Sequence, residues 1–147
     1  MRVEQTFWVS RRPEVVFEYM TDPTHLAAWQ TSKTAVEQLT VGPPGLGTLI
    51  RERTRGPGGR EFEQVVEFTE FDPPHRFRAH IVERPFLVDA VWELAAAPDG
   101  TLVRFHTDGG LTGAARLLQP LAWWLLGRRM ARYHQNLRKI VEALPDT

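Results

Sequence analysis

The sequence predicts an α+β fold in which a curved antiparallel sheet of about seven strands wraps around a long C-terminal helix. Segments with a two-residue hydrophobic period recur between Val3 and Thr107, and turns rich in glycine and proline separate most of them. From Leu126 onward the apolar residues are spaced alternately four and three apart, which is typical of an amphipathic helix. Because this helix and the longest predicted strand are of similar length, the helix can lie in the curl of the sheet.

The N-terminal region predicts one strand followed by two short helices. Val3–Val9 alternates apolar and polar residues, as a half-buried strand does. We expect a helix after it, with Ser10 as the N-cap and Pro13 in the first turn. This helix should end near Pro23, because the residue before a proline disfavours helical geometry. Thr24–Trp29 is predicted to form the second short helix.

The middle of the chain predicts an antiparallel meander. The clearest pattern lies in Arg60–Phe71, where Phe62, Val66 and Phe68 share one face and three glutamates share the other. One face of the sheet is therefore expected to be buried and the other wet. The predicted strands of this region are Lys33–Val41, Thr48–Arg55, Arg60–Phe71, Arg76–Glu83, Phe86–Ala95 and Thr101–Thr107.

The C-terminal helix is predicted from Pro120 to Leu144, a length of roughly 37 Å at about 1.5 Å per residue. Arg60–Phe71 spans roughly 40 Å at about 3.3 Å per residue. Leu117–Leu126 is apolar on all sides, and Pro120 within it predicts a kink or a restarted helix.

The apolar segment Leu117–Leu126 has three interpretations. It closes the mouth of a cavity, forms a contact in a homodimer, or makes a transient contact with a membrane. In the third case Trp124 and Leu125 would dip into the bilayer. The arginines that follow would then meet anionic head groups; they are Arg128, Arg129 and Arg132.

Composition limits the classes of function. The chain has 147 residues, no cysteine, and 18 basic against 18 acidic residues, which predicts one globular domain over residues 1–147 without disulfides or thiolate metal ligands. A net charge of zero argues against a general nucleic-acid binder. The N-terminus lacks the apolar core of a signal peptide, and the longest apolar run, Leu121–Leu126, is too short to cross a bilayer, so a cytoplasmic protein is expected.

The net charge of zero combines two unlike parts. Residues 1–110 carry a net charge of −4, whereas residues 111–147 carry +4. The C-terminal quarter is therefore a basic element beside an acidic body.

Several segments together resemble a known superfamily. They are Arg12–Pro23 with Trp29, Val41–Thr48, Val66–Pro74, Gly100-Thr101 and the Leu- and Arg-rich C-terminal end. The chain resembles the START-like, birch-pollen-allergen-like (SRPBCC) superfamily, and within it the bacterial polyketide cyclase/dehydrase and lipid-transport branch. The resemblance covers essentially the whole chain and implies the helix-grip fold. It also implies an apolar ligand between the sheet and the terminal helix, although a minority of members are enzymes. No residue matches a catalytic signature of those enzymes.

The sequence contains no recognisable nucleophile, phosphate loop or metal motif. Neither of its two serines lies in a G-x-S-x-G context, and the glycine-rich stretches Gly42–Gly47 and Gly56–Gly59 are interpreted as hairpin loops. The five histidines lack ligand spacing, so we expect no metal and no cofactor. His80 and His106 are predicted to face solvent, and His134 is placed at the margin of the apolar helix stripe, where it could also reach a ligand.

Two polar residues fall on the inward face of predicted strands. Glu52 points inward beside Ile50, and a buried carboxylate needs a partner such as an arginine, a water or a polar group of a ligand. Alternatively, Glu52 lies near a strand end at the cavity mouth and stays wet. Gln64 shares the inward face, where it binds a ligand or satisfies the backbone. Glu52 is the one weak candidate for a catalytic residue.

The inward-facing residues together predict a ligand cavity. A dry cavity of about 500 Å³ would cost about 12 kcal/mol, as much as a whole domain's stability, so the cavity must hold a ligand, hold solvent or collapse. The predicted ligand-binding residues are Trp29, Ile50, Glu52, Phe62, Gln64, Val66, Phe68, Phe77, Ala79, Trp92, Phe105, Trp123, Leu126, Met130 and Tyr133.

Three hypotheses about function follow. The first is a non-enzymatic carrier or sensor of a small hydrophobic molecule. The second is a polyketide cyclase, aromatase or dehydratase that uses Glu52, with Tyr133 or His134, for proton transfer. The third is an interaction module, similar to the chaperone co-activators of this superfamily, which would have a filled core and a protein partner.

Overall fold

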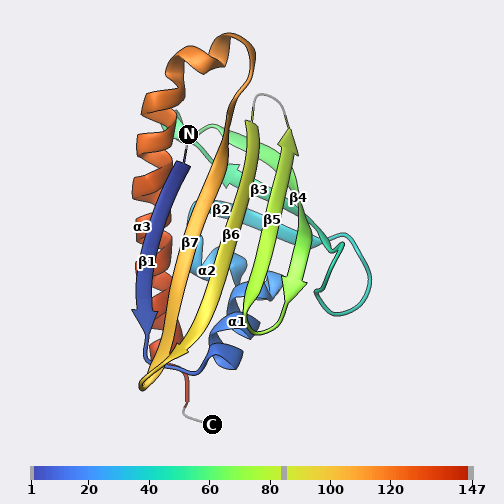
Figure 1. Ribbon diagram of the computed structural model, residues 1–147. Helices are drawn as coiled ribbons and strands as arrows, with labels where there is room; N and C mark the ends of the chain where they lie inside the picture. Colours follow the sequence, from blue (N-terminus) through green and yellow to red (C-terminus); the bar gives the residue numbers. More distant parts are fainter. Residues whose placement is uncertain (1, 84–85, 146–147) are drawn as a thin grey trace.

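The structure is a computed structural model that describes residues 2–83 and 86–145, and it confirms the predicted architecture (Figure 1). Within these residues, seven antiparallel strands form one curved sheet. In spatial order the strands are β1 (Arg2–Val9), β7 (Gly100–Leu111), β6 (Phe86–Ala97), β5 (Arg76–Glu83), β4 (Glu61–Asp72), β3 (Leu49–Arg55) and β2 (Lys33–Gln38).

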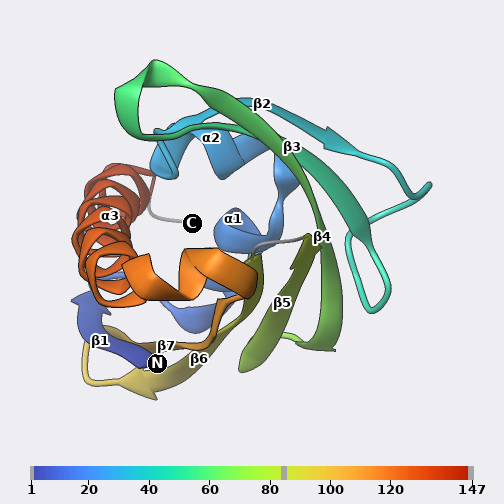
Figure 2. The ribbon, with the colours of Figure 1, turned by 90° about the horizontal axis from the view of Figure 1, so that it is seen from above.

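The helices on the concave side of this sheet are α1 (Pro13–Thr21), α2 (Leu26–Trp29) and the 24-residue helix α3 (Gln119–Glu142). The 3₁₀ turn η1 (Pro23–His25) joins α1 to α2, the short turn η2 (Pro57–Gly59) connects β3 to β4, and the 3₁₀ segment η3 (Gly113–Leu118) leads into α3. Figure 2 shows the sheet as an open arc, with α1 and α2 inside it and α3 closing the side between the edge strands. This arrangement is the predicted helix-grip fold.

The start of α1 differs from the sequence prediction. Ser10 does not cap the helix: Arg12 is the N-cap residue and makes no side-chain capping bond. The backbone N–H of Ser10 instead donates to Glu142 Oε2 at 2.8 Å, so this position joins the end of β1 to the end of α3. Pro13 occupies the first turn as predicted, because its missing N–H would have no partner there.

Several strand ends also differ from the prediction. β2 stops at Gln38, three residues earlier than expected, because the Gln38 side chain donates to the carbonyls of Thr40 and Gly42 and bends the chain into the loop. β7 continues to Leu111, past the last apolar alternation. Gly109 permits this extension: its φ is +151°, and a Cβ there would lie 1.9 Å from the Leu87 carbonyl oxygen.

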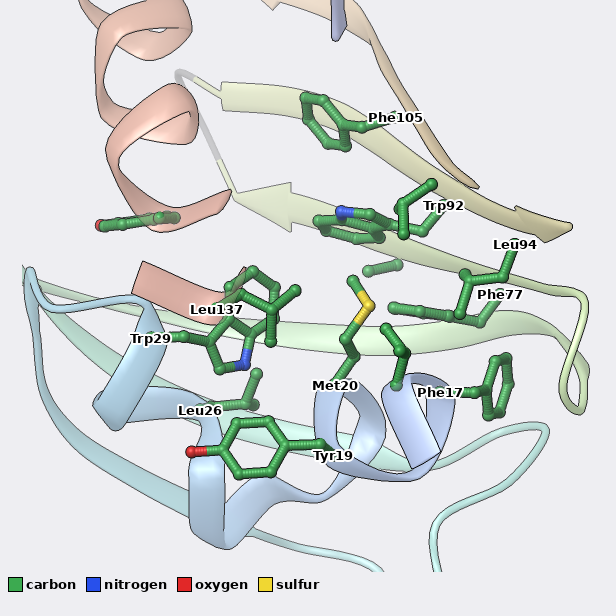
Figure 3. Close-up of a cluster of buried hydrophobic side chains, with 14 of the residues drawn as sticks. Phe17, Tyr19, Met20, Leu26, Trp29, Phe77, Trp92, Leu94, Phe105 and Leu137 are labelled. Atoms are coloured by element: carbon green, nitrogen blue, oxygen red, sulfur yellow. The ribbon is translucent and has the colours of Figure 1, made fainter. Parts of the chain in front are cut away.

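The second half of α3 packs into a closed hydrophobic core. Leu137 and Val141 are fully buried, as are Val9 of β1 and Val16 of α1. Figure 3 shows Phe17 and Met20 of α1 directed toward the sheet, with Leu137 approaching from α3. The first half of α3, by contrast, faces an open space. No helix among the described residues is both long and apolar enough to cross a membrane.

Candidate functional site

A cavity of about 880 Å³ lies between the concave face of the sheet and the first half of α3. The structure places all of the sequence-predicted ligand residues on its wall. These are Trp29, Ile50, Glu52, Phe62, Gln64, Val66, Phe68, Phe77, Ala79, Trp92, Phe105, Trp123, Leu126, Met130 and Tyr133. The cavity contrasts with the filled core that an interaction module would have.

Aromatic rings form much of the cavity wall. Trp92 lies between Phe77 and Phe105, with ring centroids 4.9 Å away on each side. Trp29 meets Trp92 edge to face at 6.2 Å. The three sheet residues come from adjacent strands at paired positions, Phe77 opposite Trp92 and Trp92 opposite Phe105, which is why strand parity alone placed them on one face. Figure 3 shows Phe77, Trp92 and Phe105 on the same side of the sheet.

Three polar side chains lie together on this mostly apolar wall. They are Lys33, Glu52 and Gln64, and we call them the polar cluster. Glu52 is only 4% exposed, so the interpretation that it stays wet is wrong. Its Oε1 accepts hydrogen bonds from Lys33 Nζ at 2.8 Å and from Gln64 Nε2 at 3.1 Å. The register explains both contacts, because Gln64 is paired with Glu52 across β3 and β4, and Lys33 begins the neighbouring strand β2.

The charges in the polar cluster balance each other. The Lys33 ammonium and the Glu52 carboxylate are both nearly buried and form one ion pair, which offsets the cost of removing each charge from water. The Lys33 ammonium has three N–H groups, and one of them is used in this ion pair. The cluster therefore presents hydrogen-bonding groups to the cavity without adding net charge to it.

Three further polar atoms on the cavity wall lack a hydrogen-bond partner among the described residues. They are the indole N–H groups of Trp29 and Trp123 and the hydroxyl of Thr54, and all three side chains are buried. A buried polar group without a partner costs free energy. A bound molecule with hydrogen-bonding atoms would satisfy such groups.

His134 lies behind the cavity wall rather than at a helix margin, so that prediction was wrong. The residue is 4% exposed and does not line the cavity. Trp92 Nε1 donates to His134 Nε2 at 3.2 Å, and His134 Nδ1 donates to Gln5 Oε1 at 2.7 Å. Gln5 Nε2 in turn donates to the Gly127 carbonyl at 2.8 Å. This chain of bonds joins β6, α3 and β1 and places the ring proton on Nδ1.

Burial lowers the pKa of His134 from its ordinary value of 6.5 to about 3. The ring is therefore neutral at physiological pH and does not supply a proton to the cavity. The outward-facing histidines behave as predicted: His80 and His106 are partly exposed, and His80 Nδ1 lies 2.8 Å from Asp89 Oδ1.

The exposed residues among those that line the cavity all belong to η3 and to α3 as far as Arg132, so the cavity opens there. Figure 1 shows η3 and the start of α3 at one end of the molecule. Large apolar side chains here point to solvent; Leu117 is 87% exposed and Trp124 is 57% exposed. We call this surface the tip, and its residues are Leu117, Leu118, Leu121, Trp124 and Leu125. Leu118, Leu121 and Leu125 also line the cavity, so the tip forms its rim.

Some residues at the cavity were missed by sequence reasoning. Lys33 was not recognised as the partner of Glu52, because a lysine at the start of a strand usually extends into solvent. Arg128, Arg129 and Arg132 also line the cavity, although they were not among the predicted ligand residues. Met20 and Leu26 were detectable as the apolar side of the short helices, which the fold brings beneath the cavity.

The described residues contain no group of three or more histidine, aspartate or glutamate side chains that could hold a metal ion. The titratable groups that do line the cavity are Lys33, Glu52, Tyr133 and the three rim arginines. The arrangement offers an apolar chamber with one neutral hydrogen-bonding cluster and a basic rim.

The fold and the cavity together define a helix-grip protein with an internal apolar chamber. The chain belongs to the family described as polyketide cyclase / dehydrase and lipid transport, whose model matches residues 1–144. The resemblance to the SRPBCC superfamily is thereby confirmed. The sequence gives no significant match to any of the curated proteins with which it was compared.

Solved structures with the same fold cover nearly the whole chain. TTHA0849 from Thermus thermophilus is 21% identical with a TM-score of 0.83, and the match covers 97% of this chain and 98% of that one. Ara h 8.0201 is 13% identical with a TM-score of 0.79, covering 98% and 99%. The di-domain ARO/CYC protein BexL from the BE-7585A biosynthetic pathway is 19% identical with a TM-score of 0.79, covering 99% of this chain and 51% of BexL. At these identities the likeness establishes the fold.

Proposed function

We propose that the protein binds a small hydrophobic molecule in its cavity, as a carrier or a sensor. The observation that supports this is the chamber itself: about 880 Å³, lined mainly by aromatic and aliphatic side chains and reaching the surface at the tip. Chambers of this size and polarity are typical of sites that enclose small organic ligands. An apolar ligand gains free energy by leaving water for such a wall. The family description, which includes lipid transport, also favours this function.

The wall further favours a ligand with an uncharged polar group, such as a hydroxyl or a carbonyl. Lys33 and Glu52 neutralise each other, so a charged group beside them would remain uncompensated in an apolar chamber. A neutral group could accept from the spare N–H groups of Lys33 or exchange a bond with the Thr54 hydroxyl.

Native mass spectrometry of freshly purified protein, followed by solvent extraction, tests the proposal. We expect a bound mass that extraction releases and that calorimetric titration restores. The variant Ala90→Trp fills the chamber, because Ala90 lines it between Val88 and Trp92 of β6. It should lower the affinity by more than about tenfold through overpacking.

Ala95→Trp is the matched control, since Ala95 lies on the same strand but is exposed. This variant should bind like the parent. Equal binding by the parent and by Ala90→Trp would show that the ligand does not occupy the chamber and would overturn the proposal.

The alternative function is a polyketide cyclase-type enzyme, and the position of Glu52 supports it. A carboxylate on the wall of an apolar chamber can take a proton from a carbon beside a carbonyl, and Lys33 Nζ, 2.8 Å away, would stabilise charge developing on the carbonyl oxygen. BexL, an ARO/CYC protein of the same fold, adds to this support.

The enzyme alternative requires turnover that depends on Glu52. Incubation with a poly-β-ketone thioester, followed by mass spectrometry, should reveal a product of lower mass by the loss of water. Glu52→Gln should abolish that product while leaving binding of the substrate intact. Absence of the product with the parent protein would exclude this alternative and leave the carrier function standing.

A further inference from the structure

The tip concentrates exposed apolar surface at one end of the molecule. Five of the nine large hydrophobic residues that are exposed in the described chain belong to residues 117–125. An apolar cluster of this kind on a surface marks a contact with another apolar body.

The charged residues that flank the tip along the chain are all basic. No aspartate or glutamate occurs between Leu111 and Glu142, whereas five arginines do. Arg128 lies over the Trp124 ring, 5.0 Å from its centroid, and Arg132 follows one turn later on the same helix face. No ion pair with a described residue is formed by any of the four arginines near the tip, which are Arg116, Arg128, Arg129 and Arg132. Their positive charge is therefore available to an external anion.

We propose that the tip docks on the surface of an anionic membrane. The apolar residues of η3 and the first turns of α3 would enter the interface, and Arg128 and Arg132 would meet the phosphate groups of the lipids. Because Leu118, Leu121 and Leu125 also form the rim of the chamber, docking would place the chamber's mouth against the acyl region. This proposal does not depend on which ligand the chamber binds.

The spacing along α3 matches the layering of a membrane interface. Figure 1 shows the tip at one extreme of the molecule, with α3 running away from it along the long axis. At about 1.5 Å per residue, Arg128 lies roughly 6 Å behind Trp124 and Arg132 roughly 12 Å behind it. Amphipathic segments bury their apolar faces by about 5–10 Å at the head-group boundary, so these arginines fall at head-group level.

A second copy of the chain is a less suitable occupant of the tip. In a symmetric dimer the same patch meets itself, so two sets of arginines would face each other without an acidic partner among tip residues. Like charges brought together across an interface oppose association. An anionic bilayer supplies both the apolar body and the opposite charge.

Co-sedimentation of the whole protein with vesicles tests the docking surface. The parent should pellet with phosphatidylcholine vesicles that contain phosphatidylglycerol, pellet less with phosphatidylcholine alone, and be released by added salt. The double variant Leu117→Glu/Trp124→Glu should lower partitioning by more than about tenfold. Arg128→Gln should lower it about fivefold on the anionic vesicles alone, because one basic residue contributes about that factor near an anionic leaflet.

Two controls separate docking from other causes. Val41→Glu alters a fully exposed apolar residue in the β2–β3 loop, and Arg51→Gln alters an exposed arginine of β3; both should pellet like the parent. Titration of the chamber ligand without vesicles should be unchanged in the Leu117→Glu/Trp124→Glu variant, so failure of docking and failure of ligand binding are distinguishable. The proposal would be overturned if the parent did not pellet with anionic vesicles, or if the tip variants still pelleted with them. It would also be overturned if light scattering showed that the parent is a dimer and that these variants are monomers.

Discussion

The ion pair between Lys33 and Glu52 is the most sensitive polar contact among the individual residues. Both side chains are nearly buried, and Gln64 donates to the same Glu52 oxygen. Lys33→Met would leave the Glu52 carboxylate buried without its cation. We expect the free energy of unfolding to fall by about 3–5 kcal/mol, measured by urea denaturation at neutral pH.

The double variant Lys33→Met/Glu52→Leu removes both charges and should recover most of that loss, since apolar replacements of a buried pair are often well tolerated. The exposed pair of Arg51 and Glu37, 3.4 Å apart, serves as the comparison. Arg51→Met should cost less than about 1 kcal/mol. A Lys33→Met variant as stable as the parent would show that the pair is solvated and not buried.

His134 should make the stability of the protein depend on pH. The folded protein keeps the ring neutral because its pKa is lowered to about 3, whereas the unfolded chain takes up a proton near the ordinary pKa of 6.5. The contribution of His134 to the free energy of unfolding is therefore complete above about pH 6.5. It is lost as the pH falls toward 3, by about 1.4 kcal/mol per pH unit. Urea denaturation should show a loss of about 2 kcal/mol between pH 6.5 and 5.

The variant His134→Gln supplies the control, because an amide can also accept from Trp92 and donate to Gln5 but does not titrate. Its stability should be nearly flat between pH 6.5 and 5. The carboxyls of Asp22, Glu70 and Glu142 have pKa values below their ordinary range, so they contribute only at lower pH. An equal slope in the parent and in His134→Gln would assign the pH dependence elsewhere.

At the scale of elements, α3 serves two purposes along its length. Leu137, in the closed half, is fully buried, whereas Leu126, in the open half, is partly exposed and lines the chamber. Leu137→Ala should destabilise the fold by about 2–5 kcal/mol, and Leu126→Ala by less than about half of that. Calorimetric titration should show the reverse order for loss of ligand affinity. Equal costs at the two positions would mean that the two halves are packed alike.

The order of the elements and the inward face of each strand could be predicted from the sequence. Alternation is a local signal, and it correctly placed Phe62, Phe77 and Trp92 on the chamber wall. What could not be predicted depends on distant pairing. Ser10 is bonded to Glu142 rather than to its own helix, and the partner of Glu52 comes from the neighbouring strand β2.

The burial of His134 on α3 could not be predicted either, because it also depends on residues that are distant in the sequence. Its neighbour Tyr133 belongs to the apolar stripe, so a marginal position was the natural expectation. The curvature of the sheet brings Gln5 and Trp92 to either side of the imidazole, and burial follows from this. A polar residue can therefore occupy a buried helix position when two other elements supply its hydrogen bonds.

For the molecule as a whole, we expect a ligand in the chamber to raise the melting temperature, Tm. A ligand that binds only the folded state adds about 2.7 kcal/mol when present at about 100 times its Kd. For a chain of this length, that corresponds to a rise in Tm of roughly 5–10 °C. Differential scanning calorimetry before and after solvent extraction measures the shift. An unchanged Tm after extraction of a bound mass would place that mass outside the folded chamber.

Charge is distributed unevenly between two parts of the molecule. The body formed by the sheet and short helices is acidic, and the segment that contains η3 and α3 is basic. Surface arginines of the sheet, such as Arg53 and Arg76, are paired with glutamates, whereas those beside the tip are not paired with described residues. The cationic end is thus the one that also carries the chamber's mouth.

The five tryptophans give the protein a built-in optical readout of both proposed events. Trp29, Trp92 and Trp123 line the chamber, Trp8 is partly buried on β1, and Trp124 stands exposed at the tip. Intrinsic emission therefore combines a blue component from enclosed indoles with a red component from Trp124. A near-ultraviolet-absorbing guest in the chamber would quench the first, and transfer of Trp124 into lipid would shift the second. One emission spectrum, compared with that of Trp124→Phe, separates filling of the chamber from contact at its mouth.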